Sequence, residues 1–148
     1  MKILKNIFAK RRPQKEPHNV MRIANVIGPV LDGVVHDIFT AYRMELLSEP
    51  ITYIVPAVWG AKKEGDLTPV QKEINMRVVP AINKAYDSLQ MRNLGSDQEF
   101  ALYFLIRGLI ISKITFMIET LRSRLSERSM DEQNLKEALL RFKPQGSA

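Results

Sequence analysis

The chain of 148 residues contains no cysteine and only two histidines, His18 and His36. A disulfide bond, a thiolate zinc site and a thiol nucleophile are therefore excluded, and two histidines are too few for a histidine-rich metal site. We expect no metal and no cofactor. A reducing, cytoplasmic environment fits a chain without cysteine. With 45% hydrophobic and 26% charged residues, a chain of this length is typical of one globular domain that folds without cross-links.

The common local signatures of enzymes are also missing. Neither of the two Gly-x-x-x-x-Gly spacings, which begin at Gly28 and Gly60, is followed by the Lys-Ser/Thr of a phosphate-binding loop. The best candidate for a polar site is Asp32 with His36, because residues four apart share a helix face and an acid can orient an imidazole. Both fall on the polar side of their helix, which favours an exposed, structural role. The sequence thus favours a non-enzymatic function and identifies no catalytic residue.

Acidic residues are absent from the first 15 positions, which carry six of the 22 Lys and Arg residues. The other 16 bases are balanced by 16 acids, so the formal charge of +6 lies entirely on this segment. A nucleic-acid-binding domain usually spreads positive charge over its folded body, which makes nucleic acid the less favoured partner. A secretory signal is not expected either, because Lys5 interrupts the apolar stretch.

Residues 1–12, which we call the arm, have the pattern of an amphipathic helix on a membrane surface, with apolar side chains on one face and basic ones opposite. Each basic residue near an anionic leaflet contributes on the order of 1 kcal/mol, so binding should be reversible and salt-sensitive. Two alternatives are that the arm docks on the body or on another chain, or that it is disordered. The predicted membrane-binding residues are Lys2, Ile3, Leu4, Lys5, Ile7, Phe8, Lys10, Arg11 and Arg12.

Residues 13–18 contain two prolines and no apolar side chain, which predicts an extended linker between the arm and the body. The body, residues 19–143, shows helical periodicity and no strand pattern. An amphipathic helix should run from Asn19 to Ala41 with a kink at Pro29, because proline removes one hydrogen bond of a helix interior. A short irregular helix is expected within residues 51–59.

Capping signals predict three further helix starts, at Thr68, Ser96 and Ser129. The helix after Thr68 should be kinked at Pro80. The expected fold class is therefore an all-α bundle of four to five helices with kinks at prolines, preceded by the arm on its linker. Residues 144–148 form a C-terminal tail.

The segment from Phe100 to Ile118 is the most apolar and should be the most buried helix. Arg107 lies among its apolar positions. Glu45 likewise lies within the apolar arc of the first long helix, so the two are candidates for a buried ion pair. Two alternatives for Arg107 are that it reaches water at a helix edge or faces a partner chain. A membrane span is disfavoured, because Arg107 and Lys113 lie near the middle of the segment.

Trp59 closes the short apolar stretch before Lys62 and Lys63. An indole beside two lysines suits a membrane interface, but a lone tryptophan in this setting is more often part of the core, and we expect the core.

Together these patterns predict a non-enzymatic, all-α interaction module, either an adaptor or a self-associating structural subunit, bound peripherally to an anionic cytoplasmic membrane surface by its arm. Its expected partners are that membrane and a protein, which includes a second copy of the chain. One alternative is a small nucleic-acid-associated regulator whose arm contacts phosphates. Another is a helical bundle that encloses an apolar ligand or an active site around His36.

Overall fold

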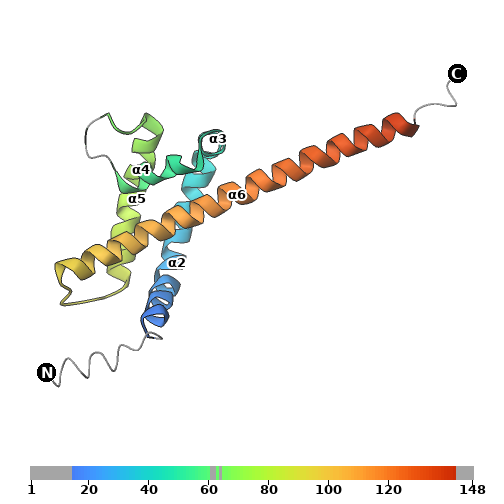
Figure 1. Cartoon of the computed structure of the whole chain (residues 1–148). Helices are drawn as coiled ribbons and strands as arrows, with labels where there is room; N and C mark the ends of the chain where they lie inside the picture. The colour runs from blue at the N-terminus through green and yellow to red at the C-terminus, as the bar shows by residue number, and fades with distance from the viewer. Residues whose placement is uncertain (1–14, 61–62, 64, 143–148) are drawn as a thin grey trace.

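The computed structural model describes residues 15–60, 63 and 65–142, and the side chains of residues 20–60, 63 and 65–141. Within these ranges every regular element is a helix (Figure 1), which confirms the predicted all-α fold class. Helix α5 packs against α2 and α4, and α6 contacts all three. The elements are α2 (Lys15–Ala41), α3 (Arg43–Ser48), the 3₁₀ helix η1 (Ile51–Tyr53), α4 (Ile54–Trp59), α5 (Pro69–Ser88) and α6 (Ser96–Phe142).

Helix α2 buries one apolar side chain per turn from Ile27 to Ile38. Pro29 lies on the exposed side and the helix continues through it. The helix begins at Lys15, so residues 15–18 are helical and the prediction of an extended linker there is wrong. Pro17 permits this start, because the N–H groups of a first helical turn have no intrahelical partner to lose.

The chain leaves the helical conformation for one residue at Tyr42 (φ −119°, ψ 25°), and α3 begins at the next residue. Because of this break, the side chains after Tyr42 no longer continue the helical faces of α2. Helix α3 buries Leu46. The irregular helix predicted within residues 51–59 is confirmed as η1 followed by α4, which buries Ile54, Ala57 and Val58.

Helix α5 starts at the predicted capping box. The Thr68 hydroxyl accepts a hydrogen bond from the Gln71 N–H at 3.1 Å, and the Gln71 side-chain oxygen accepts one from the Thr68 N–H at 2.9 Å. The Gln71 side-chain nitrogen also donates to the Tyr53 carbonyl at 2.9 Å. These bonds satisfy the amide, so a glutamine can be buried here, and they fix the start of α5 against η1.

Helix α6 is one helix of 47 residues. It begins at Ser96, as predicted, although the amide oxygen that caps it belongs to Gln98 and accepts from the Gly95 N–H at 2.9 Å. The helix start predicted at Ser129 is wrong, because α6 runs through it. Neither glycine nor proline occurs between Gly108 and Pro144. A capping signal without a helix breaker costs the continuing helix little.

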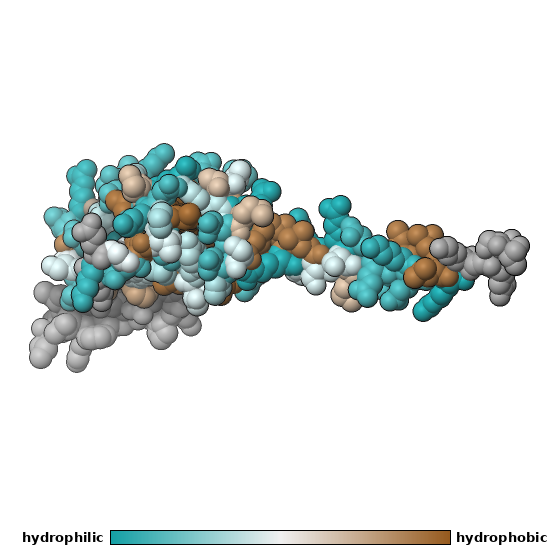
Figure 2. Space-filling view, turned by 90° about the horizontal axis from the view of Figure 1, so that it is seen from above, coloured by the Kyte–Doolittle hydropathy of each residue, from teal (hydrophilic) through white to brown (hydrophobic). Residues whose placement is uncertain are grey.

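The core lies where α2, α4 and α5 meet the first half of α6. We call residues 96–122 the inner half of α6 and residues 123–142 the outer half. Ile106, Ile110, Ile114 and Ile118 of the inner half are at most 1% exposed. The outer half buries none of its described side chains and projects away from the bundle (Figures 1 and 2). The packed part of the bundle therefore ends near Arg122, and the bounds predicted for the bundle domain, residues 19–143, stay a prediction.

Candidate functional site

An apolar surface is exposed at the end of the bundle where α2 and α6 begin. The rings of Phe100 and Phe104 are 67% and 55% exposed and lie 6.3 Å apart. The Phe104 ring also lies 5.2 Å from the ring of Trp59. A cleft of about 490 Å³ adjoins them, and the residues that line it include Val20, Ile23, Met91, Leu94, Phe104 and Leu105. We call Phe100, Trp59 and this cleft the apolar end surface.

The predicted membrane-binding residues of the arm, Lys2, Ile3, Leu4, Lys5, Ile7, Phe8, Lys10, Arg11 and Arg12, all lie outside the described residues. The arm nevertheless joins the bundle at a described place. It precedes α2, and about 8 Å of helix separates Lys15 from Val20, which lines the cleft. The chain therefore enters the bundle close to the apolar end surface.

Two expectations about burial are wrong. The segment from Phe100 to Ile118 was expected to be the most buried helix, but it is buried on one side only. Phe100, Phe104 and Phe116 are exposed, and a side chain added at Gly108 would meet no atom within 4 Å. Trp59 was expected in the core, but it is 37% exposed. An all-round apolar helix gives no periodicity from which its covered side could be predicted.

The buried ion pair predicted between Glu45 and Arg107 is not formed. Glu45 is exposed on α3, because the break at Tyr42 removes it from the angular series of α2 on which the prediction rested. The Arg107 guanidinium carbon lies instead 5.0 Å from the centre of the Trp59 ring and 5.8 Å from that of Tyr103. Its Nε atom is buried without a hydrogen-bond partner among the described residues. Cation–π contact with two rings therefore replaces the expected counter-charge.

Asp32 and His36 are both exposed, as their place on the polar side of α2 predicted. The Asp32 carboxylate accepts a hydrogen bond from the Lys113 ammonium of α6 at 2.7 Å. This pair gives Asp32 a structural role between the two helices. In the part of the chain that the structure describes, no group of three or more potential metal ligands gathers at one place.

Two tyrosines have perturbed acidity. Desolvation raises the pKa of Tyr42, and the neighbouring Glu73 raises it further. Desolvation also raises the pKa of Tyr86, with Glu99 adding to the shift, and the Tyr86 ring stacks on Tyr103 at 4.5 Å. Both phenols are protonated near neutral pH, so neither supplies a phenolate for catalysis.

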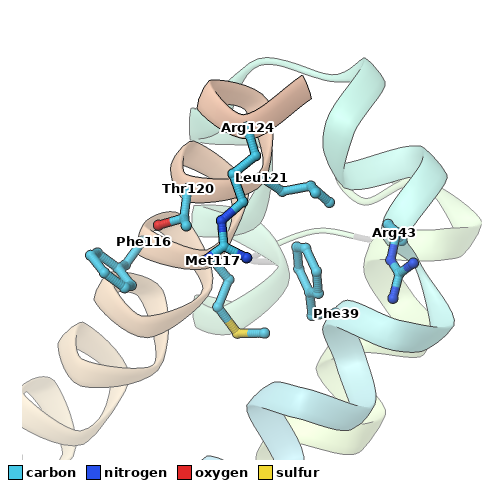
Figure 3. A pocket seen from close by; sticks show the side chains of 7 residues that line it. All are labelled: Phe39, Arg43, Phe116, Met117, Thr120, Leu121 and Arg124. Carbon is cyan, nitrogen blue, oxygen red and sulfur yellow. The ribbon is translucent and has the colours of Figure 1, made fainter. Parts of the chain in front are cut away.

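A second apolar surface lies where the outer half of α6 leaves the bundle. Figure 3 shows Phe39 of α2 facing Met117 and Leu121 of α6 across a pocket of about 290 Å³. Arg122 anchors α6 beside it, because its guanidinium donates to the carbonyl oxygens of Leu46, Leu47 and Glu49 at 3.4, 3.1 and 2.6 Å. These bonds satisfy carbonyl groups at the end of α3 that have no partner in the helix.

Helices α2, over Val20–Ala41, and α6 are long and apolar enough to cross a membrane by length and composition. Core helices of bundles pass the same criterion, so this evidence for a membrane span is weak. The inner half of α6 places Ile106, Ile110, Ile114 and Ile118 in the core, and Lys113 pairs with Asp32. The observed contacts are those of a bundle.

The fold and surfaces define an all-α helical bundle with an exposed apolar end and a projecting helix. Comparison with protein-family models, curated proteins and solved structures finds no match to the chain.

Proposed function

We propose that this protein is a non-enzymatic, all-α interaction module that binds an anionic membrane surface peripherally, through its arm and the apolar end surface together. The observation that carries the proposal is the exposed aromatic group of Phe100, Phe104 and Trp59, of which Phe104 lines the cleft together with Val20, near the start of α2. The arm, which carries five of the six net positive charges, is attached at that end. Basic and apolar contacts therefore adjoin each other, as interfacial binding requires.

The physical contributions are complementary. Each basic residue of the arm near an anionic leaflet contributes on the order of 1 kcal/mol, and a phenylalanine transferred from water to hydrocarbon contributes about 1.5 to 3 kcal/mol. Tryptophan suits the headgroup region, because its ring is apolar and its N–H donates to a polar group. Anionic lipids face the cytoplasm, which makes a cytoplasmic, peripheral location the corresponding proposal.

Co-sedimentation with vesicles tests this proposal. The full-length protein should pellet with phosphatidylserine-containing vesicles and stay in solution with pure phosphatidylcholine vesicles. Ile7→Glu with Phe8→Glu should abolish pelleting, because two carboxylates would be desolvated and repelled by the leaflet at once. Lys2→Gln with Lys5→Gln should weaken binding less, and high salt should mimic this second pair, because screening removes only the Coulomb attraction.

A matched pair of variants tests the role of the apolar end surface. Phe100→Ser removes a ring that is 67% exposed at this surface, and Phe116→Ser removes one that is 69% exposed, about 24 Å further along α6. Vesicle binding should fall for Phe100→Ser and stay unchanged for Phe116→Ser. Equal effects would contradict the role of the apolar end surface. If the wild-type protein stays in the supernatant with anionic vesicles at low salt, the membrane proposal fails, and a shift of labelled DNA would favour nucleic acid.

A further inference from the structure

The outer half of α6 buries no side chain against the described part of the chain. Its described side chains are all exposed except Ala138, which is half-buried. Figure 2 shows it as a rod that carries separate apolar patches. The outer half extends a helix that is already nucleated in the bundle, but without packing each added residue contributes little stability. A partner that covers its apolar side would account for a helix of this length.

The apolar side of the outer half has the spacing of a coiled coil. The residues on this side, which we call the seam, recur at alternating intervals of three and four positions. They lie on the same helix face as Ile110 and Ile114, which are in the core. Three of them are large exposed leucines, with Leu125 at 49%, Leu135 at 61% and Leu139 at 61%. The seam consists of Ile118, Leu121, Leu125, Arg128, Glu132, Leu135 and Leu139.

Two charged residues interrupt this seam, and their order specifies how two such helices pair. Arg128 and Glu132 form an ion pair within one helix, with Nε and Oε1 3.4 Å apart. In a parallel pair of helices, Arg128 would face Arg128 and Glu132 would face Glu132. In an antiparallel pair, each Arg128 faces Glu132 of the second copy. Charges at a seam are desolvated, so like charges there disfavour the parallel arrangement strongly.

The same antiparallel register aligns the leucines. Placing Arg128 opposite Glu132 of the second copy places Leu125 opposite Leu135 and Leu121 opposite Leu139. Because the two copies are equivalent, each of the three pairings occurs twice, and the six layers of complementary side chains span residues 121–139, just under three heptads. Any other antiparallel register would separate Arg128 from Glu132 of the second copy and would also separate the paired leucines.

The pocket at the base of the outer half fits this arrangement. Leu121 lines it together with Phe39 and Met117, and its volume is about 290 Å³ (Figure 3). In the antiparallel register, Leu139 of the second copy lies opposite Leu121 and enters this pocket. The bundles then lie at opposite ends of the paired helices. In a parallel pair the two bundles would lie side by side, at the same end of the paired helices. They would compete for the space beside Ile118, which is already covered by the bundle of its own chain.

We propose that the outer half of α6 binds a second copy of this chain as an antiparallel two-stranded coiled coil, with Arg128 facing Glu132 of the second copy. The pairing rests on the proposed role as an interaction module. The test of pairing needs no vesicles. The dimer proposal can therefore fail while the membrane proposal stands, and the membrane proposal can fail while the dimer proposal stands.

Sedimentation equilibrium of the full-length protein tests the interface. The wild type should be a concentration-dependent dimer. Leu125→Asp with Leu135→Asp should raise the dimer dissociation constant at least about a hundred-fold, because both copies lose both layers. Met130→Asp with Leu140→Asp is the matched control, since these residues are 62% and 65% exposed but lie off the seam. A monomeric wild type, or equal loss of the dimer in both double variants, would overturn the proposal.

Disulfide cross-linking tests the orientation, and the chain is suited to it because it has no cysteine of its own. Leu125→Cys and Leu135→Cys are prepared separately, mixed and oxidised. The antiparallel register brings residue 125 of one copy against residue 135 of the other, within the distance that a disulfide needs. The mixed dimer should therefore be the main product. Cross-linking of each variant mainly to itself would show a parallel pair and overturn the proposal.

Discussion

The inner and outer halves of α6 present the same apolar face to different surroundings. In the inner half, Ile106, Ile110, Ile114 and Ile118 are covered by α2, α4 and α5. In the outer half, Leu125, Leu135 and Leu139 continue the face into solvent. An apolar side chain stabilises a fold only where other atoms of the protein pack against it. The same kind of side chain thus stabilises the fold in one half and leaves a surface available for a partner in the other.

The largest expected effect separates the two halves directly. Ile110→Ala should lower the free energy of unfolding by about 2 to 5 kcal/mol, because it leaves a cavity beside a fully buried site. Leu135→Ala should change it by less than about 0.5 kcal/mol at concentrations where the protein is monomeric. Urea unfolding followed by circular dichroism measures both. A large cost of Leu135→Ala in the monomer would show that the outer half folds back onto the bundle.

The boundary between the halves gives the next largest effect. Arg122→Ala removes one donor group from three carbonyl oxygens at the end of α3 and should cost about 1 to 3 kcal/mol. Arg124→Ala, two residues further along the same helix, should cost less, because no hydrogen bond from Arg124 is seen to the described residues. Thermal unfolding of the two variants side by side makes the comparison. Equal melting temperatures would mean that the bonds of Arg122 do not anchor α6.

A smaller effect is expected at Arg107 of the inner half, whose guanidinium lies against the Trp59 ring. Arg107→Met keeps most of the packing and removes a buried Nε atom that has no hydrogen-bond partner in the described ranges, so stability should change by no more than about 1 kcal/mol. A buried ion pair would instead cost about 3 to 5 kcal/mol when broken. The chain has one tryptophan, so a shift of its emission should report the loss of the cation beside Trp59.

The smallest effect concerns the arm. Deleting residues 1–12 should leave the helical circular dichroism unchanged and the stability within about 0.5 kcal/mol, because the bundle buries its core without them. A loss of several degrees in the melting temperature would show that the arm docks, with the cleft beside the inner half as the nearest apolar surface.

The periodicity of the sequence predicted the helices well and their ends less well. Where a capping box coincided with a proline, at Thr68 and Pro69, the helix start was confirmed with both hydrogen bonds. The box at Ser129 stood alone and did not start a helix. The exposed position of Asp32 and His36 also followed from the helical wheel. The partner of Arg107 did not, because a single nonhelical residue at Tyr42 placed Glu45 on another face.

The spacing of Leu121, Leu125, Leu135 and Leu139 is present in the sequence, but its meaning depends on where the bundle ends. A helix face with this pattern packs equally well inside its own domain or against a second chain. The sequence by itself determined the all-α class, the amphipathic faces, the charged arm and the absence of thiol chemistry, because these follow from composition and from interactions between near neighbours. Only the tertiary structure decided which parts of the apolar faces are covered. Coverage depends on contacts between residues far apart in the chain, such as Arg122 with the end of α3 and Arg107 with Trp59.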